Sequence, residues 1–154
     1  MADIGAENDA QHGAQGGVVE YLHRLVEATL TRLGDAAAGL GVLDIDLAEP
    51  SQPPRPGLQV GQHLRITIGP TGPDSGPVGP DTVGVHFSLT VPREQAVVAV
   101  VEQIQDHVIE GAHGAAVPAC PGHHHPLQPA VLDAVPSWVC PRDPAHHAEP
   151  ILPP

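Results

Sequence analysis

The sequence predicts an α+β fold in which a helix, a three-stranded antiparallel or mixed sheet and a second helix precede a small C-terminal hairpin. Apolar residues recur at helical spacing in residues 17–33 and again in residues 92–111. Between these segments, apolar and polar residues alternate in three short stretches, as expected for strands with one buried face. Both cysteines follow the second helix, in a stretch rich in histidine and proline. We expect the two helices to cover the apolar face of the sheet.

The first helix is predicted from Gly17 to Leu33, and Gly34 is suited to end it. Residues 1–16 before it are mainly small and polar, so they bury too little surface to offset the entropy of ordering. We therefore expect a flexible N-terminal tail. The positions that recur at steps of three and four residues, and that should face the core, are Val18, Leu22, Leu25, Val26, Thr29 and Leu33.

The three strands are predicted at residues 43–47, 64–68 and 83–91. In the first, the residues expected on the buried face are Leu43, Ile45 and Leu47. The third gives the clearest pattern, because a slip of one residue would expose its whole apolar face. That face comprises Val83, Val85, Phe87, Leu89 and Val91.

Asp44 and Asp46 alternate with the apolar residues of the first strand. Two carboxylates at this spacing share one face of a strand, as paired catalytic acids would. The solvated outer face of a sheet needs polar residues in any case, so we assign these two aspartates no catalytic role.

Two segments rich in proline are predicted to connect the strands as loops. Residues 49–57, with the sequence EPSQPPRPG, can continue neither a strand nor a helix. Residues 69–80 repeat Gly-Pro-x triplets, but the run is short and interrupted, which excludes a collagen helix.

The second helix begins at Pro92, which is favourable at the first helical position, and Gly111 can end it. Its buried stripe is predicted to comprise Val97, Val100, Val101, Ile104 and Val108. The predicted organisation is a tail (1–16), an α+β domain (17–111), a linker (112–119), a C-terminal module (120–147) and a second tail (148–154).

The composition argues against several classes of function. The formal net charge is −12, and all six basic residues are scattered arginines, so we do not expect binding to nucleic acid. The N-terminus does not resemble a secretory signal, and no stretch is apolar over the length of a membrane span. We expect a cytoplasmic protein that does not bind membranes and whose partners are other proteins.

Residues 120–147 contain both cysteines and five of the eleven histidines. Cys120-Pro-Gly-His123 has the two-residue spacing at which two ligands converge on one metal from a tight turn. A second Cys-Pro pair begins at Cys140 and is followed by His146. Thiolates and imidazoles are the ligands that Zn²⁺ prefers. A disulfide between the cysteines, inert thiols, and adventitious metal binding by histidines are the alternatives.

In outline, residues 120–147 resemble a zinc ribbon, in which two metal-binding turns flank a hairpin; the rest of the chain resembles no family that we identify. Zinc ribbons generally carry Cys-Pro-x-Cys in both turns, whereas here histidine replaces the second cysteine of the first turn and the second turn is longer. The predicted Zn²⁺ ligands are Cys120, His123, Cys140 and His146. His124 or His125 can replace His123, and His147 can replace His146.

These observations predict a non-enzymatic structural or protein-interaction protein with a structural zinc site. One alternative is a subunit of a larger assembly such as a virus particle, in which neighbours hold segments that composition predicts to be mobile. The other is a zinc-dependent hydrolase, although the sequence lacks HExxH and offers only Asp133 and Asp143 as a general base near the ligands. Because residues 120–147 contain few large apolar side chains, we expect metal removal to unfold this module alone.

Overall fold

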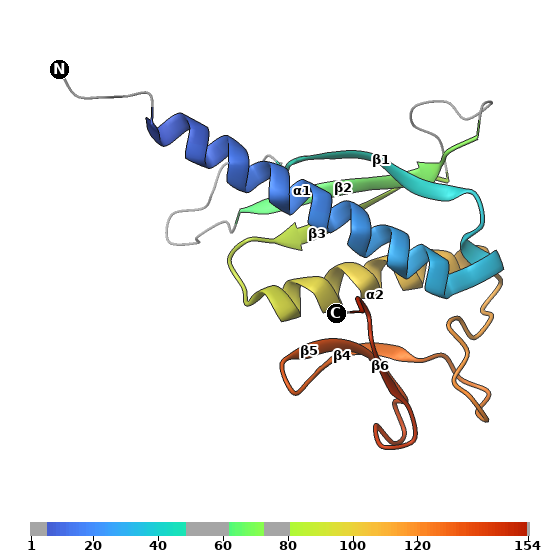
Figure 1. Ribbon diagram of the computed structural model, residues 1–154. Helices are drawn as coiled ribbons and strands as arrows, with labels where there is room; N and C mark the ends of the chain where they lie inside the picture. Colours follow the sequence, from blue (N-terminus) through green and yellow to red (C-terminus); the bar gives the residue numbers. More distant parts are fainter. Residues whose placement is uncertain (1–5, 49–61, 73–80, 154) are drawn as a thin grey trace, which may run out of the picture.

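A computed structural model describes residues 6–48, 62–72 and 81–153, with the backbone alone for residues 6–15. It has the α+β class that the sequence predicts, with two helices and two three-stranded antiparallel sheets (Figure 1). The elements are α1 (Ala6–Leu33), a short 3-10 helix η1 (Gly34–Ala37), β1 (Leu40–Leu47), β2 (His63–Pro70), β3 (Val83–Ser88), α2 (Arg93–Gly111), β4 (Gln128–Leu132), β5 (Val135–Val139) and β6 (Ala148–Pro150).

The first sheet has the strand order β1-β2-β3. Ile66 in its central strand lies opposite Ile45 of β1 and Val85 of β3, so apolar residues form a continuous row across one face. Helix α1 lies along β1 and α2 lies along β3, and both helices contribute to the same core as these strands. The predicted arrangement of two helices on the apolar face of a sheet is therefore correct.

A β-bulge in β1 corrects the predicted pattern of that strand. The register shifts between Val42 and Asp44, so that Val42 pairs with Ile68 and Asp44 with Thr67. The extra residue, Leu43, lies beside Gly69 and not among the residues packed on the core. Strict alternation fails here because a bulge places two residues of one strand opposite one residue of its neighbour.

Two element boundaries also differ from the sequence prediction. Helix α1 begins at Ala6, well before Gly17, so most of the predicted tail is helical. Extension from a packed helix adds one hydrogen bond for each residue fixed, which composition alone does not capture. Strand β3 ends at Ser88, which leaves Leu89 and Val91 about two-fifths exposed. Residues 1–5, the connector 49–57 and residues 73–80 of the second loop lie outside the described residues.

The second sheet has the order β4-β5-β6. Strands β4 and β5 form a hairpin that pairs Leu132 with Val135. The two residues between them, Asp133 and Ala134, have φ angles of 47° and 64°, which suit a two-residue turn between antiparallel strands. Strand β6, which pairs Trp138 with Glu149, was not predicted from the sequence.

Helix α2 lies between the two sheets (Figure 1). Its buried residues belong to one hydrophobic cluster that also includes Leu127, Trp138 and Ile151 of the C-terminal part. The core therefore continues across the predicted linker at residues 112–119. Among the described helices, none has the length and apolar character needed to cross a membrane.

Candidate metal centre

The first three residues of the candidate site lie in one loop, residues 117–127, which we call the ligand loop. Its two ends are held together by an isolated bridge between Ala119 and Pro126. The backbone N–H of Leu127 donates to the carbonyl of Pro118 at 2.8 Å, and the backbone N–H of Cys120 donates to the carbonyl of His125 at 3.1 Å. The loop is therefore closed at its base by backbone hydrogen bonds. Its three candidate ligands lie at the last of these bonds and in the turn beyond it, between residues 120 and 125.

Four side chains converge at this loop: Cys120, His123 and His125 from the loop itself, and Cys140 from the end of β5. Their ligand atoms all lie within 4.8 Å of one another. His123 Nδ1 is 3.4 Å from Cys120 Sγ and 3.6 Å from Cys140 Sγ. His125 Nε2 is 3.9 Å from Cys140 Sγ.

These distances match the geometry of a tetrahedral zinc site. With Zn–S bonds of about 2.3 Å and Zn–N bonds of about 2.0–2.1 Å, each tetrahedron edge that joins a sulfur to a nitrogen is about 3.6 Å long. The three sulfur–nitrogen distances lie within a few tenths of an ångström of that value. The four atoms as a set spread over up to 4.8 Å, so the side chains must close by about 1 Å before a single ion contacts all of them.

The two cysteines are free thiols and are buried, with 2% of Cys120 and 0% of Cys140 exposed. Burial raises the pKa of Cys120, and the neighbouring Cys140 raises it further. Burial acts in the same direction on Cys140, but backbone N–H groups of Asp143 and Arg142 and the thiol of Cys120 stabilise its thiolate, and its pKa falls. Cys140 is therefore the thiol that ionises more readily.

The imidazole of His123 is favoured in its neutral form. Burial lowers its pKa, and the neighbouring rings of His146 and His125 lower it further. A neutral imidazole has a lone pair available for a metal, whereas a protonated one does not. The electrostatics of His123 thus suit a metal ligand.

Of the four ligands predicted from sequence, the structure brings together Cys120, His123 and Cys140, while His125 takes the fourth place. His146 lies beside this group without joining it. The centroid of its ring is 4.4 Å from the ring centroid of His123. Its Nε2–H donates to the carbonyl of Pro121 at 2.6 Å. This hydrogen bond attaches His146 to Pro121 of the ligand loop, so His146 contacts the loop without joining the group.

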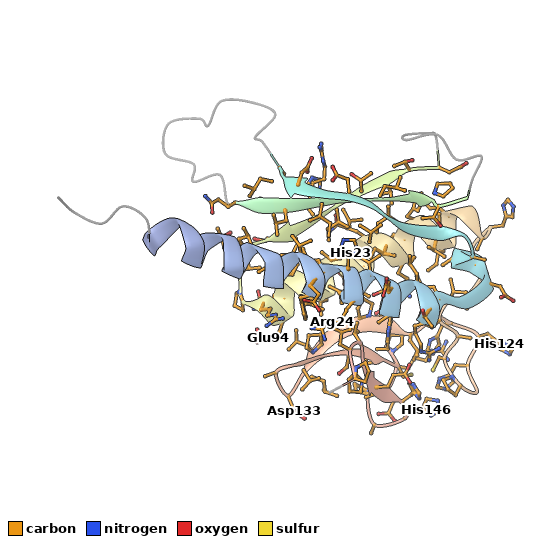
Figure 2. All side chains as sticks on the ribbon, turned by 45° about the horizontal axis from the view of Figure 1, so that its top comes forward. His23, Arg24, Glu94, His124, Asp133 and His146 are labelled. Carbon is orange, nitrogen blue, oxygen red and sulfur yellow. The ribbon has the colours of Figure 1, made fainter. Side chains whose placement is uncertain are left out.

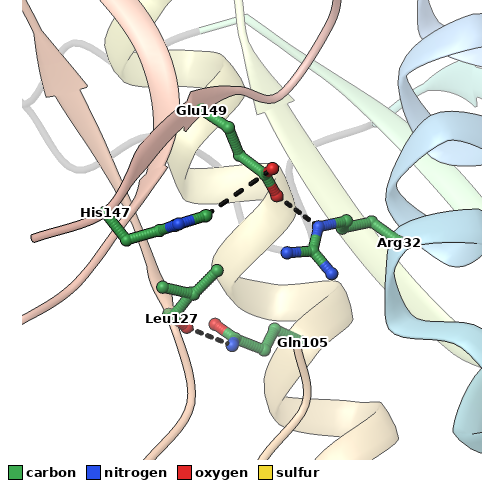
Figure 3. Close-up of polar contacts among 5 residues, drawn as sticks. All are labelled: Arg32, Gln105, Leu127, His147 and Glu149. Atoms are coloured by element: carbon green, nitrogen blue, oxygen red, sulfur yellow. Dashed lines mark hydrogen bonds and ion pairs between the residues drawn. The ribbon is translucent and has the colours of Figure 1, made fainter. Parts of the chain in front are cut away.

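The other two histidines that the sequence left open lie away from the group. His124 is exposed and points outward (Figure 2). His147 faces Glu149, with its Nε2 3.6 Å from a carboxylate oxygen (Figure 3). Spacing alone offers His125 only as an alternative to His123, because residues 123–125 lie in bends, where no regular periodicity sets the direction of each side chain.

The two carboxylates that the sequence offered as general bases, Asp133 and Asp143, are not members of the converging group. Asp133 occupies the hairpin turn, at the end of the sheet away from His124 and His146 (Figure 2). Asp143 accepts a hydrogen bond from the backbone N–H of Ala145 at 2.9 Å. Within the described residues, the converging group comprises two cysteines and two histidines and no carboxylate.

This Cys₂His₂ group is compatible with a zinc-binding module, in which the ligand loop supplies three ligands and Cys140, directly after β5, supplies the fourth. Comparisons of the chain with protein-family models, with curated proteins and with solved structures each found no match.

Proposed function

We propose that the protein is a non-enzymatic structural or protein-interaction protein whose C-terminal sheet is held by one structural Zn²⁺. The ligands are Cys120, His123, His125 and Cys140. The observation that carries this proposal is the convergence of two sulfur and two nitrogen atoms within 4.8 Å. Four protein ligands complete a tetrahedral shell, as in structural zinc sites.

The ligand chemistry favours zinc over other common metals. Thiolate ligands select against Mg²⁺ and Ca²⁺, which prefer oxygen. A mixed set of two thiolates and two imidazoles in tetrahedral arrangement is typical of Zn²⁺. The buried position of both sulfur atoms also protects the thiolates from oxidation.

A structural role fits the small size of the C-terminal sheet. Val131, Leu132 and Val135 at the tip of its hairpin are each more than one third exposed, so they contribute little burial. An ion that joins the ligand loop to the end of β5 supplies a cross-link between these two segments.

The competing proposal, a zinc hydrolase, requires an open coordination position and a general base. The closed four-residue set and the local hydrogen bond of Asp143 support the structural role instead.

Metal analysis of the purified protein, combined with X-ray absorption at the zinc edge, tests the proposal. We expect about one Zn²⁺ per chain, with two sulfur ligands at about 2.3 Å and two nitrogen ligands at about 2.0–2.1 Å. A protein purified without metal that takes up none on addition of Zn²⁺, or a first shell without sulfur, would refute it.

A further inference from the structure

Helix α2 carries two glutamines, Gln103 and Gln105, whose side chains make hydrogen bonds to different parts of the fold. Positions two apart on a helix differ by about 200° in direction, so the two amides point to nearly opposite sides. Gln103 binds the edge of β3, where its Oε1 accepts from the N–H of His86 at 3.1 Å and its Nε2 donates to the same residue's carbonyl at 3.4 Å.

Gln105 binds the ligand loop instead. Its Nε2 donates to the carbonyl of Val117 at 2.8 Å and to that of Leu127 at 2.7 Å; Figure 3 shows the second of these bonds. Val117 and Leu127 are the first and last residues of the loop, and the three ligands Cys120, His123 and His125 lie between them. One amide group thus joins both ends of the segment that supplies three of the four candidate ligands.

The surroundings of Gln105 make this contact specific. Its side chain is 5% exposed and lies among the apolar residues of α2, where water does not readily replace a lost donor. Both carbonyls are bound by the same nitrogen, so their separation is fixed by the geometry of a single amide. A residue of similar shape without N–H groups would leave the loop ends without this donor.

We propose that Gln105 is a positioning residue for the metal centre, which holds the ends of the ligand loop so that three ligands meet Cys140, and which couples metal binding to the packing of α2. This inference rests on the proposed zinc site. The new element is a role for Gln105, which is not itself a metal ligand. Coupling of this kind is reciprocal, so a bound ion also holds Gln105 and its helix in place.

The test compares Gln105→Met with Gln103→Met, which removes the same amide from the same helix on the side away from the metal. Zinc affinity is measured in the full-length protein by competition with a chelator of known affinity, at a temperature where the metal-free variants remain folded. We expect Gln105→Met to weaken zinc binding by about tenfold or more, within the usual range for coupling between two sites. Gln103→Met should lower the melting temperature and leave zinc affinity at the wild-type value.

A second measurement needs no variant, which covers the case in which Gln105→Met does not fold. In the wild-type protein, the side-chain amide protons of both glutamines are followed by NMR with and without Zn²⁺. Because the coupling is reciprocal, we expect removal of the metal to accelerate exchange of the Gln105 amide by about tenfold or more and to leave that of Gln103 unchanged. Equal zinc affinity in the two variants, or equal responses of the two amides, would overturn the positioning role. Failure of the wild-type protein to bind zinc at all would instead refute the proposed function.

Discussion

Arg32 in α1 and Glu149 in β6 form an ion pair that joins the first helix to the last strand (Figure 3). The same carboxylate group lies near His147, which precedes β6. Together with Gln105, this pair gives the C-terminal sheet polar contacts with both helices. The sheet is therefore attached to the rest of the molecule by more than its connecting chain.

This attachment changes the expected result of metal removal. The sequence alone predicts that chelation unfolds only residues 120–147. Because Leu127, Trp138 and the buried face of α2 share one core, we now expect chelation to increase hydrogen exchange in α2 as well, with residues 104–108 affected most. Hydrogen exchange monitored by mass spectrometry, with and without chelator, measures this. New exposure confined to about residues 115–150 would show instead that the two parts are independent.

The ion pair itself should contribute little to stability. Both side chains are 36% exposed, so solvent and salt screen their attraction. We expect Glu149→Gln to lower the free energy of unfolding by less than about 1 kcal/mol, with a smaller effect at high salt. Urea denaturation at two salt concentrations tests this, and Asp46→Asn, which removes the exposed partner of Arg65, is the matched control. A loss well above that of the control at both salt concentrations would show that Glu149 contributes more than an exposed ion pair does.

His125 belongs to the group of four in the structure, whereas His146 belongs to the ligand set predicted from sequence. Variants of these two residues therefore distinguish the two sets. We expect His125→Ala to weaken zinc binding by orders of magnitude, since it removes one of four ligands. His146→Ala should keep one zinc per chain, because its Nε2 is bound to the Pro121 carbonyl. Absorption spectra of the Co²⁺-substituted proteins, with His124→Ala as an exposed control, distinguish these outcomes. The reverse ranking of the two variants would restore His146 as a ligand.

The sequence predicted those parts of the fold in which local periodicity and burial agree. The apolar face of β3 and the buried stripe of α2 are examples, since Val85 and Val100 are fully buried as expected. It did not predict features that depend on distant partners. Strand β6 has three residues and no alternating pattern of its own, and it exists because it pairs with β5. The bulge at Leu43 likewise follows from pairing with β2.

For the candidate site, the sequence identified the chemistry better than the geometry. The two Cys-Pro pairs and nearby histidines indicated thiolate and imidazole ligands, and three of the four predicted residues lie together. The fourth could not be chosen from spacing, because the direction of each histidine depends on how the ligand loop closes. That closure involves Gln105, which is more than a dozen residues away from the site in sequence.

Trp138 provides an intrinsic probe of the C-terminal sheet. It is the chain's single tryptophan, is 1% exposed, and lies two residues before Cys140. We expect its fluorescence maximum to shift to longer wavelength when metal is removed, because loosening of β5 admits water to the ring. Stopped-flow fluorescence after mixing with chelator gives the rate of this change. An unchanged spectrum in protein shown to have lost its metal would mean that the sheet remains packed on α2 without the ion.

Zinc binding should release protons and weaken as pH falls, because protons compete for the ligand atoms. The raised pKa of Cys120 means that this thiol holds its proton at neutral pH and must lose it on binding. The lowered pKa of Cys140 makes its contribution smaller, and the lowered pKa of His123 means that its ring is already neutral and releases none. We therefore expect release of about one to two protons per Zn²⁺ at pH 7, with affinity rising as pH increases until both thiols are ionised in the metal-free protein. Calorimetric titration in buffers of different ionisation enthalpy measures this number. Release of no protons would mean that the cysteines are not ligands, and release of more than two would mean that at least one liganding histidine is protonated in the metal-free protein.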